Sequence, residues 1–213
     1  MKYAMNLEMK GRRCVVLGGG PVALRKVRRL VRAEAAVTVV APMAVMELAE
    51  LALERRIRWE QRGYEESDLD GAFLVICATN DADVNAKAAQ AAKERGMLVN
   101  APAQPSLSDF TVPASLSRGK LLFTISTDGG SPALSRAIRQ QLEALYPKSF
   151  GDWLDIVAAL REEQKERLGT AREREQFWRT ALDDGILQLV RAGRLDEAKE
   201  KVRHAAHLSG TQS

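Results

Sequence analysis

The sequence has little of what stabilises secreted or membrane proteins. Only two cysteines occur among its 213 residues, and Cys14 and Cys77 each lie in an apolar stretch. We interpret them as small buried side chains in a reducing compartment, and not as a disulfide or a metal pair. No apolar run approaches the roughly 18 residues of a membrane helix, and residues 1–8 lack the apolar core of a secretory signal. We therefore expect a cytoplasmic protein without a membrane segment.

Histidines and the familiar catalytic sets are equally scarce. His204 and His207 stand three residues apart, a spacing that suits one metal ion but that we interpret as an exposed helix face. No serine or cysteine nucleophile has a histidine that the sequence pairs with it. The sequence thus predicts neither a metal site nor a hydrolase of the triad type.

The charge is unevenly distributed. The formal net charge is +4, and residues 113–150 carry five basic and two acidic side chains. This excess hints at an anionic ligand near that segment. Basic runs interleaved with aromatic residues, which nucleic-acid binding would favour, do not occur, so we expect no nucleic-acid partner.

Residues 12–100 alternate short apolar runs with longer helical patterns. Strands are predicted at Arg13–Leu17, Val37–Ala41, Ile57–Glu60, Phe73–Cys77 and Met97–Val99. Helices are predicted near Pro21–Ala33, Ala44–Arg55 and Asp83–Arg95. This alternation is typical of an α/β fold with a parallel sheet and right-handed crossovers. The run Phe73–Cys77 is apolar throughout, as in a strand covered on both faces.

The rest of the chain divides into two parts. Residues 113–147 contain a predicted strand, Leu121–Ser126, and a helix that begins after Ser131 and ends before Pro147. One strand and one apolar helix face are too little for a core, so we expect this part to pair with a second copy. Residues 148–213 are helical in pattern, and their apolar stripes are interpreted as core. We thus predict a Rossmann domain over 1–112, a central α+β dimerisation region over 113–147 and a small helical domain over 148–213.

The strongest chemical signal is the glycine-rich run that follows the first predicted strand. In Val15–Ala23, Gly18 permits a tight turn, Gly20 lets the backbone approach a pyrophosphate, and Ala23 keeps the helix close to its strand. The helix N-terminus then offers N–H groups and a partial positive charge to phosphates. A glycine-rich turn without a ligand is the alternative, but the strand and helix flanks favour a dinucleotide. The expected contacts are Gly18, Gly19, Gly20, Pro21 and Val22.

Two further loops should lie at the same edge of the sheet. The second strand ends in Ala41-Pro42-Met43, where neither an acid for the ribose nor an arginine for a 2′-phosphate stands, which tilts the cofactor weakly toward NAD. The fourth strand ends in Ala78-Thr79-Asn80-Asp81. These four residues are predicted either to contact the cofactor or to cap the next helix, and both roles are compatible.

Several motifs, taken together and in order, resemble the precorrin-2 dehydrogenases, a family that includes the N-terminal part of sirohaem synthases. The resemblance rests on Gly11–Lys26, Val37–Pro42, Ala78–Asn85, Ser126–Arg139 and Arg174–Trp178. It implies an NAD-binding Rossmann domain, a homodimer, and oxidation of precorrin-2 to sirohydrochlorin with reduction of NAD. The residues it implies near the tetrapyrrole substrate are Asn100, Ser126, Thr127 and Ser131.

One position departs from that family. Where its members usually carry an aspartate after the fifth strand, this chain has Ala103, so no catalytic carboxylate carries over. Asp109 and Asp128 are the remaining acids nearby. We weigh a catalytic role for either against a loop cap at Asp109 and a turn former at Asp128. The loss of the carboxylate counts against efficient insertion of iron, an activity that some members add.

Two other functions remain open at this point. A Rossmann domain can sense NAD without turnover, and a related protein can insert metal into a tetrapyrrole, or carry one, without oxidising it. The match over Ser126–Arg139 and the basic excess favour the dehydrogenase, because a sensor needs neither.

Overall fold

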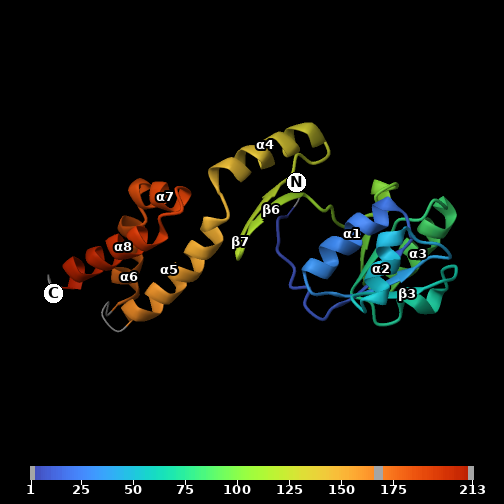
Figure 1. The fold of residues 1–213 in the computed structure, drawn as a ribbon. Helices are drawn as coiled ribbons and strands as arrows, with labels where there is room; N and C mark the ends of the chain where they lie inside the picture. Colours follow the sequence, from blue (N-terminus) through green and yellow to red (C-terminus); the bar gives the residue numbers. More distant parts are fainter. Residues whose placement is uncertain (1–2, 166–169, 211–213) are drawn as a thin grey trace. The chain divides into compact units, whose positions relative to one another are not determined.

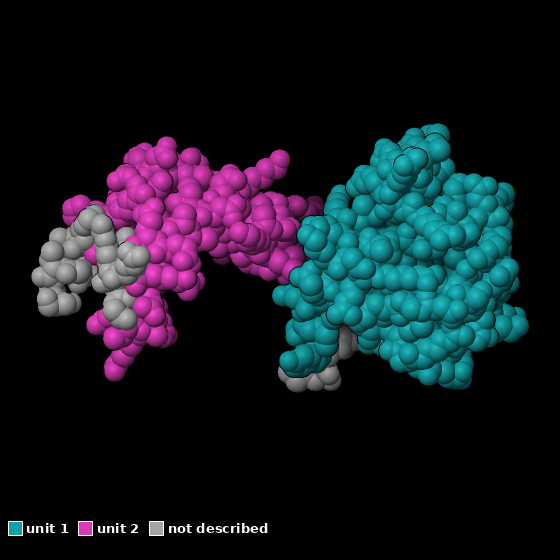
Figure 2. Space-filling model, turned by 90° about the horizontal axis from the view of Figure 1, so that it is seen from below, with its two compact units in different colours: residues 1–112 teal, residues 113–213 magenta. Residues whose placement is uncertain are grey.

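The structure is a computed structural model that describes residues 3–165 and 170–210. The chain forms two compact units, Met1–Val112 and Pro113–Ser213, which Figure 2 colours separately. The first is an α/β unit and the second combines a β-hairpin with helices.

The described part of the first unit contains a five-stranded parallel sheet. Its strands are β1 (Arg13–Leu17), β2 (Ala36–Val40), β3 (Arg58–Glu60), β4 (Leu74–Cys77) and β5 (Leu98–Asn100). The order β3-β2-β1-β4-β5 means that the chain moves outward from β1 to β3 and then crosses to the other side of β1. The topological switch point, where dinucleotides bind in open α/β sheets, therefore lies between β1 and β4.

Helices cover both faces of this sheet (Figure 1). On one face, α1 (Pro21–Arg32) and α2 (Met46–Leu53) pack on alternate residues of the strands, including Val16, Val39 and Ile76. On the other, α3 (Ala82–Glu94) packs its alanines on the intervening residues. This arrangement confirms the predicted α/β fold. Cys14 and Cys77 are buried, and burial raises the pKa of each thiol to about 11, so both stay protonated.

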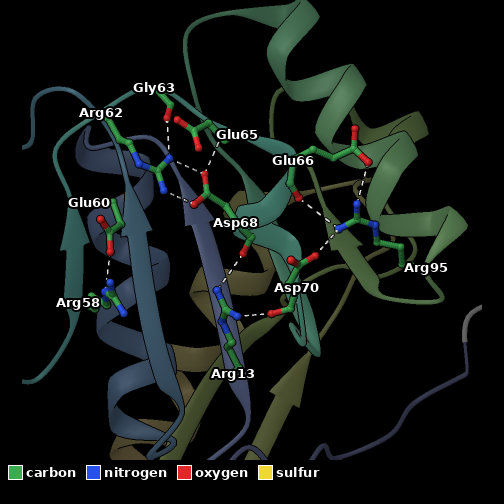
Figure 3. A network of polar contacts seen from close by, with 10 residues as sticks. All are labelled: Arg13, Arg58, Glu60, Arg62, Gly63, Glu65, Glu66, Asp68, Asp70 and Arg95. Atoms are coloured by element: carbon green, nitrogen blue, oxygen red, sulfur yellow. Dashed lines mark hydrogen bonds and ion pairs between the residues drawn. The ribbon is translucent and has the colours of Figure 1, made fainter.

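A polar network fixes the connection between β3 and β4 (Figure 3). The short 3-10 helix η1 (Glu66–Leu69) carries Asp68, whose carboxylate accepts two hydrogen bonds from Arg62 at 2.9 and 2.6 Å. Arg13, on β1, donates to the backbone carbonyls of Asp68 and Asp70, and Arg95 pairs with Glu66 and Asp70. Burial alone would raise the pKa of Asp68, but the bonds from Arg62 and the Glu65 N–H lower it.

The second unit begins with an antiparallel hairpin, β6 (Ala114–Arg118) and β7 (Leu121–Ile125), followed by α4 (Pro132–Leu145). Strand β6 was not predicted, because only Leu116 of its five residues is buried and its pattern is largely polar. Gly119 turns the hairpin at φ +56°, and a Cβ there would lie 3.3 Å from Gly151, so the turn packs tightly on the helix over Ser149–Lys165 (α5).

Four helices complete the second unit as described. They are α5 (Ser149–Lys165), α6 (Ala171–Ala181), α7 (Asp184–Arg191) and α8 (Leu195–Gly210). Their shared core contains Trp153, Leu160, Phe177, Ile186 and Val190, which confirms the apolar stripes as core.

Candidate functional site

The glycine turn after β1 has no room for side chains at its first two positions. Gly18 has a φ of +112°, and a Cβ on it would lie 2.3 Å from the carbonyl oxygen of Ala78. A Cβ on Gly19 would lie 2.1 Å from the carbonyl oxygen of Met43. Both contacts are with backbone, which cannot swing aside as a flexible side chain can. These glycines are therefore required by close packing of the turn.

Those contacts bring together the three loops that the sequence assigned to a cofactor. The Gly18 N–H donates to the Val40 carbonyl at 3.0 Å, and the Val45 N–H donates to the Gly19 carbonyl at 2.8 Å. The turn is thus tied to the end of β2 and abuts Ala78 at the end of β4. The residues sit at the carboxyl edge of the sheet on either side of the switch point.

Gly20 differs from its two neighbours. A Cβ built on it would meet no atom within 4 Å, and its backbone (φ −85°, ψ −176°) is one that any residue adopts. It is the N-cap of α1, yet no side chain caps this helix and its first turn holds no acidic residue. Open space in front of an uncapped, positively polarised helix end suits a pyrophosphate. The turn therefore fits the phosphates of a dinucleotide.

The loop after β4 is organised by hydrogen bonds. Asp81 caps α3 by accepting from the Asp83 and Val84 N–H groups. Asn85 is buried, and its amide oxygen accepts hydrogen bonds from the hydroxyl of Thr79 at 2.8 Å and from the backbone N–H of Thr79 at 3.2 Å. Its amide nitrogen donates to the Thr79 carbonyl at 3.0 Å. The capping role predicted here is confirmed, while cofactor contact by Ala78, Thr79, Asn80 and Asp81 remains a prediction. Asn85 was not singled out, because its burial depends on tertiary packing.

At the end of β2, Ala41 is buried and its carbonyl accepts a hydrogen bond from the Trp59 indole at 3.0 Å. Pro42 and Met43 are exposed, and Met43 is 84% accessible. An exposed apolar side chain next to the glycine turn can face an adenine ring, which keeps the predicted contact open.

Asn100, the last residue of β5, is 5% exposed and fully engaged. Its amide oxygen accepts from the Lys26 ammonium at 2.8 Å, and its amide nitrogen donates to the Phe110 carbonyl at 3.0 Å. Burial, with the nearby charges of Arg29 and Arg25, lowers the pKa of Lys26 to about 8. Sequence reasoning gave Lys26 no role, because among neighbouring arginines it resembles a solvated surface residue.

The two candidate positions after β5 differ. Ala103 is exposed in the loop that leads to the 3-10 helix η2 (Pro105–Leu107). Asp109 accepts a hydrogen bond from the Val99 N–H at 3.0 Å and pairs with Lys93 at 3.5 Å. Asp109 therefore ties the loop to β5, as expected of the loop cap that was the alternative to a catalytic role.

The remaining predicted site residues gather at the start of α4 in the second unit. The Ser131 hydroxyl accepts from the Leu134 N–H at 3.1 Å, which confirms it as the N-cap. The Thr127 hydroxyl accepts from the Ser131 N–H at 3.1 Å and donates to its carbonyl at 3.2 Å. Asp128 holds a left-handed φ of +53°, and its N–H donates to the Ser126 hydroxyl at 3.3 Å. The turn thus presents one carboxylate beside a helix N-terminus.

The described residues also bear on metal binding and on membrane insertion. No group of three or more histidine, cysteine or acidic side chains in the described parts of the chain is arranged to hold a metal ion. The side chain of His207, one of the paired histidines, lies outside the described residues. None of the described helices is both long and apolar enough to cross a membrane.

Two family models match the chain. Residues 5–114 match a family described as putative NAD(P)-binding, and residues 149–205 match the sirohaem synthase dimerisation region. The first match covers the glycine turn and the two loops beside it, after β2 and after β4. It supports NAD as the cofactor of this unit.

Relatives of known name cover nearly the whole chain. A sirohaem synthase of Thioalkalivibrio sulfidiphilus is 38% identical over 95% of this chain and 42% of its own length. One of Methylococcus capsulatus is 37% identical over 97% of this chain and 44% of its own. The chain therefore spans less than half the length of these relatives. The solved structure of SirC, a precorrin-2 dehydrogenase, is 30% identical with a TM-score of 0.75, over 96% of this chain and 98% of that one. This chain belongs to the family of precorrin-2 dehydrogenases and sirohaem synthases.

Proposed function

We propose that this chain is an NAD-dependent dehydrogenase that oxidises precorrin-2 to sirohydrochlorin in the cytoplasm. The observation that carries the proposal is the space at Gly20, open on the ligand side of a turn whose other two glycines are closed by backbone contacts. The name and near-complete coverage of the SirC structure support the choice of substrate. The family model over residues 5–114 supports the cofactor.

The reaction removes a hydride and a proton from the macrocycle, and bound NAD supplies the hydride acceptor. The turn residues Gly18, Gly19 and Gly20, with Pro21 and Val22 at the start of α1, hold the pyrophosphate. The loops at Ala41-Pro42-Met43 and Ala78-Thr79-Asn80-Asp81 enclose the two nucleoside ends. Holding the reactants in a fixed orientation supplies most of the acceleration, because two bound partners react as if at a very high local concentration.

The second unit is proposed to pair two copies and to receive the substrate. Leu134, Leu145 and Leu122 are about half exposed, at 51, 50 and 47%. A second copy would cover these side chains of the 113–147 segment. The matched dimerisation region at 149–205 supports a homodimer that also involves the helical part, 148–213. The basic excess of residues 113–150 suits a polycarboxylate substrate, with Ser126, Thr127 and Ser131 offering hydroxyls and a helix N-terminus.

An anaerobic absorbance assay tests the proposal. Precorrin-2 is mixed with the protein and NAD, with or without ferrous or cobaltous ion, and NADH and the tetrapyrrole spectrum are followed together. We expect NADH to form without metal and the metal to add little, because Ala103 provides no carboxylate there. Metal insertion without NADH would mean a chelatase. NAD binding without any change of the tetrapyrrole would mean a regulatory module.

A further inference from the structure

Lys26 is a partly buried cation whose polar partner is an uncharged amide. Its Nζ lies 2.8 Å from Oδ1 of Asn100, a residue 74 positions away in the sequence. No carboxylate among the described residues forms an ion pair with it. A lysine whose only task was to satisfy Asn100 could be replaced by a neutral donor without the cost of desolvating a charge.

The position of Lys26 relative to the glycine turn follows from the fold. Helix α1 begins at the carboxyl edge of the sheet, and its side chains lean back toward that N-terminus. Lys26 lies about 9 Å along the helix axis from Gly20, and its ammonium reaches Asn100. Asn100 is opposite Ile76 in the sheet and ends β5, so the ammonium lies at the carboxyl edge.

This is the side of the switch point that the reactive half of a dinucleotide occupies. The adenosine ribose meets the end of the second strand. With the pyrophosphate at Gly20, the other half extends over β4 and β5, on the opposite side of β1 in the strand order. Lys26 and Asn100 are on that side.

The surroundings of Lys26 make its ammonium easier to deprotonate than that of an exposed lysine. The charged groups that act on it are Arg29 and Arg25, on its own helix. The other groups near it are the Asn100 amide and the Phe110 carbonyl, which accepts a hydrogen bond from this amide. Neither group titrates. Burial and the two arginines therefore lower the pKa of Lys26 from 10.5 to about 8. A neutral amine still donates one hydrogen to Asn100 and keeps a lone pair for a proton.

We propose that Lys26, oriented by Asn100, accepts the proton that leaves the tetrapyrrole when its hydride goes to NAD. The inference rests on the dehydrogenase function proposed above. In the step, a C–H bond of the macrocycle breaks and its electron pair passes to the nicotinamide, which is reduced. An N–H or C–H proton of the macrocycle passes to the lone pair of Lys26, giving an ammonium that later returns the proton to water. The macrocycle loses two electrons and two hydrogens, and NADH and one proton balance them.

The first test measures the titration of Lys26 itself and does not depend on turnover. Carbon-13 NMR of the lysine ε-methylenes in the full chain with NAD bound is followed from neutral to alkaline pH. We expect one lysine to titrate near pH 8, as its lowered pKa requires, and its signal to be missing from Lys26→Met. A Lys26 that titrates with the ordinary lysines would overturn the proposal. The titration curve is measured on the wild type, and Lys26→Arg, which also lacks this signal, assigns it if Lys26→Met folds poorly.

The second test is the pH profile of kcat for precorrin-2 oxidation. Only neutral Lys26 accepts a proton, so the wild-type rate should rise with pH and level off above about 8. Lys26→Met should lower kcat about a hundredfold, the lower range for a lost acid–base group, and lose this rise. Lys26→Arg should be equally slow, because a guanidinium keeps its proton. In both variants the affinity for NAD, measured by calorimetry, should stay within about twofold.

Arg28→Met is the matched control, since Arg28 is an exposed cation on the same helix and the side-chain hydrogen bonds of Asn100 go to Lys26 and Phe110. It should keep the wild-type rate and profile. If Lys26→Met retains kcat within about fivefold or keeps the rise with pH, or if Lys26→Arg restores activity, Lys26 does not accept the proton. A wild type that forms no NADH from precorrin-2 would instead reject the proposed function, and with it this step.

Discussion

The two units of this chain bury their apolar residues in different ways. In the first, every residue of β4 is buried and helices cover both faces of the sheet, so the unit completes its own core. In the second, the β7 strand alternates half-buried and exposed residues, and α4 has Ser135 as its only buried residue. The first unit can be understood from one chain, whereas we propose that a second copy covers the apolar side chains of the hairpin and α4.

The largest effect we expect comes from closing the glycine turn of the first unit. Gly19→Ala would place a methyl 2.1 Å from the Met43 carbonyl, so the backbone of the second loop must move. We expect a loss of about 3 kcal/mol in the free energy of unfolding, as for a strongly overpacked site. Urea denaturation followed by circular dichroism measures it. A loss below about 0.5 kcal/mol would mean that the turn is not packed as described.

A substitution on the exposed apolar face of the second unit should weaken the homodimer without destabilising the fold. Leu134→Glu puts a charge on a half-exposed residue, and an acid in the first turn of α4 does not harm the helix. We expect the dissociation constant of the homodimer to rise about thirtyfold, on the order of 2 kcal/mol for one buried leucine. Sedimentation velocity measures it, with the exposed Gln140→Glu as control. A wild type that is monomeric at micromolar concentration would remove the basis for this expectation.

Gly20→Asp sharpens the contrast within the glycine turn. The side chain meets open space and an ordinary backbone, so the protein should fold as the wild type does. A carboxylate in front of the α1 N-terminus repels the pyrophosphate and occupies its space. We expect NAD affinity to fall at least about tenfold, or 1.4 kcal/mol, in calorimetry. Unchanged NAD binding by this folded variant would refute the assignment of the site.

The smallest effect is expected at the carboxylate of the second unit. Asp128 lies in the turn just before the Ser131 N-cap of α4, among the residues proposed to contact the substrate. Asp128→Asn should therefore weaken substrate binding a few-fold, seen as a higher KM with kcat nearly unchanged. If kcat instead fell about a thousandfold with precorrin-2 binding intact, Asp128 and not Lys26 would be the proton acceptor.

The same difference between the units explains what the sequence could predict. The bounds predicted for β1, Arg13–Leu17, are those observed, because a strand buried on both faces is a continuous apolar run. Strand β6 was missed, since its extended conformation depends on pairing with β7 and only one of its five residues is buried. Helix α4 was predicted from Ser131 before it, Pro147 after it and an apolar face that the single chain leaves exposed.

At the candidate site, features formed by neighbouring residues could be predicted from the sequence, whereas features formed by residues far apart in the chain could not. The glycine turn and the Asp81 cap follow from neighbouring residues, and the structure confirms the turn, the following helix and the cap. Lys26 gave no signal, because its environment comes from Asn100 and Phe110, far along the chain. Because the nearby Arg25, Arg28 and Arg29 are exposed cations, the sequence gives no sign that the Lys26 amine is partly buried.

The central claim is that the glycine turn binds NAD and that the chain uses it to oxidise precorrin-2. The most direct measurement is the anaerobic yield of NADH and sirohydrochlorin in one reaction at limiting NAD. We predict one NADH for each sirohydrochlorin with the wild type, and formation of both products at least about tenfold slower with folded Gly20→Asp at the same limiting NAD concentration. Oxidation that proceeds equally without NAD, or a wild type that binds NAD and precorrin-2 yet forms no NADH, would contradict the account.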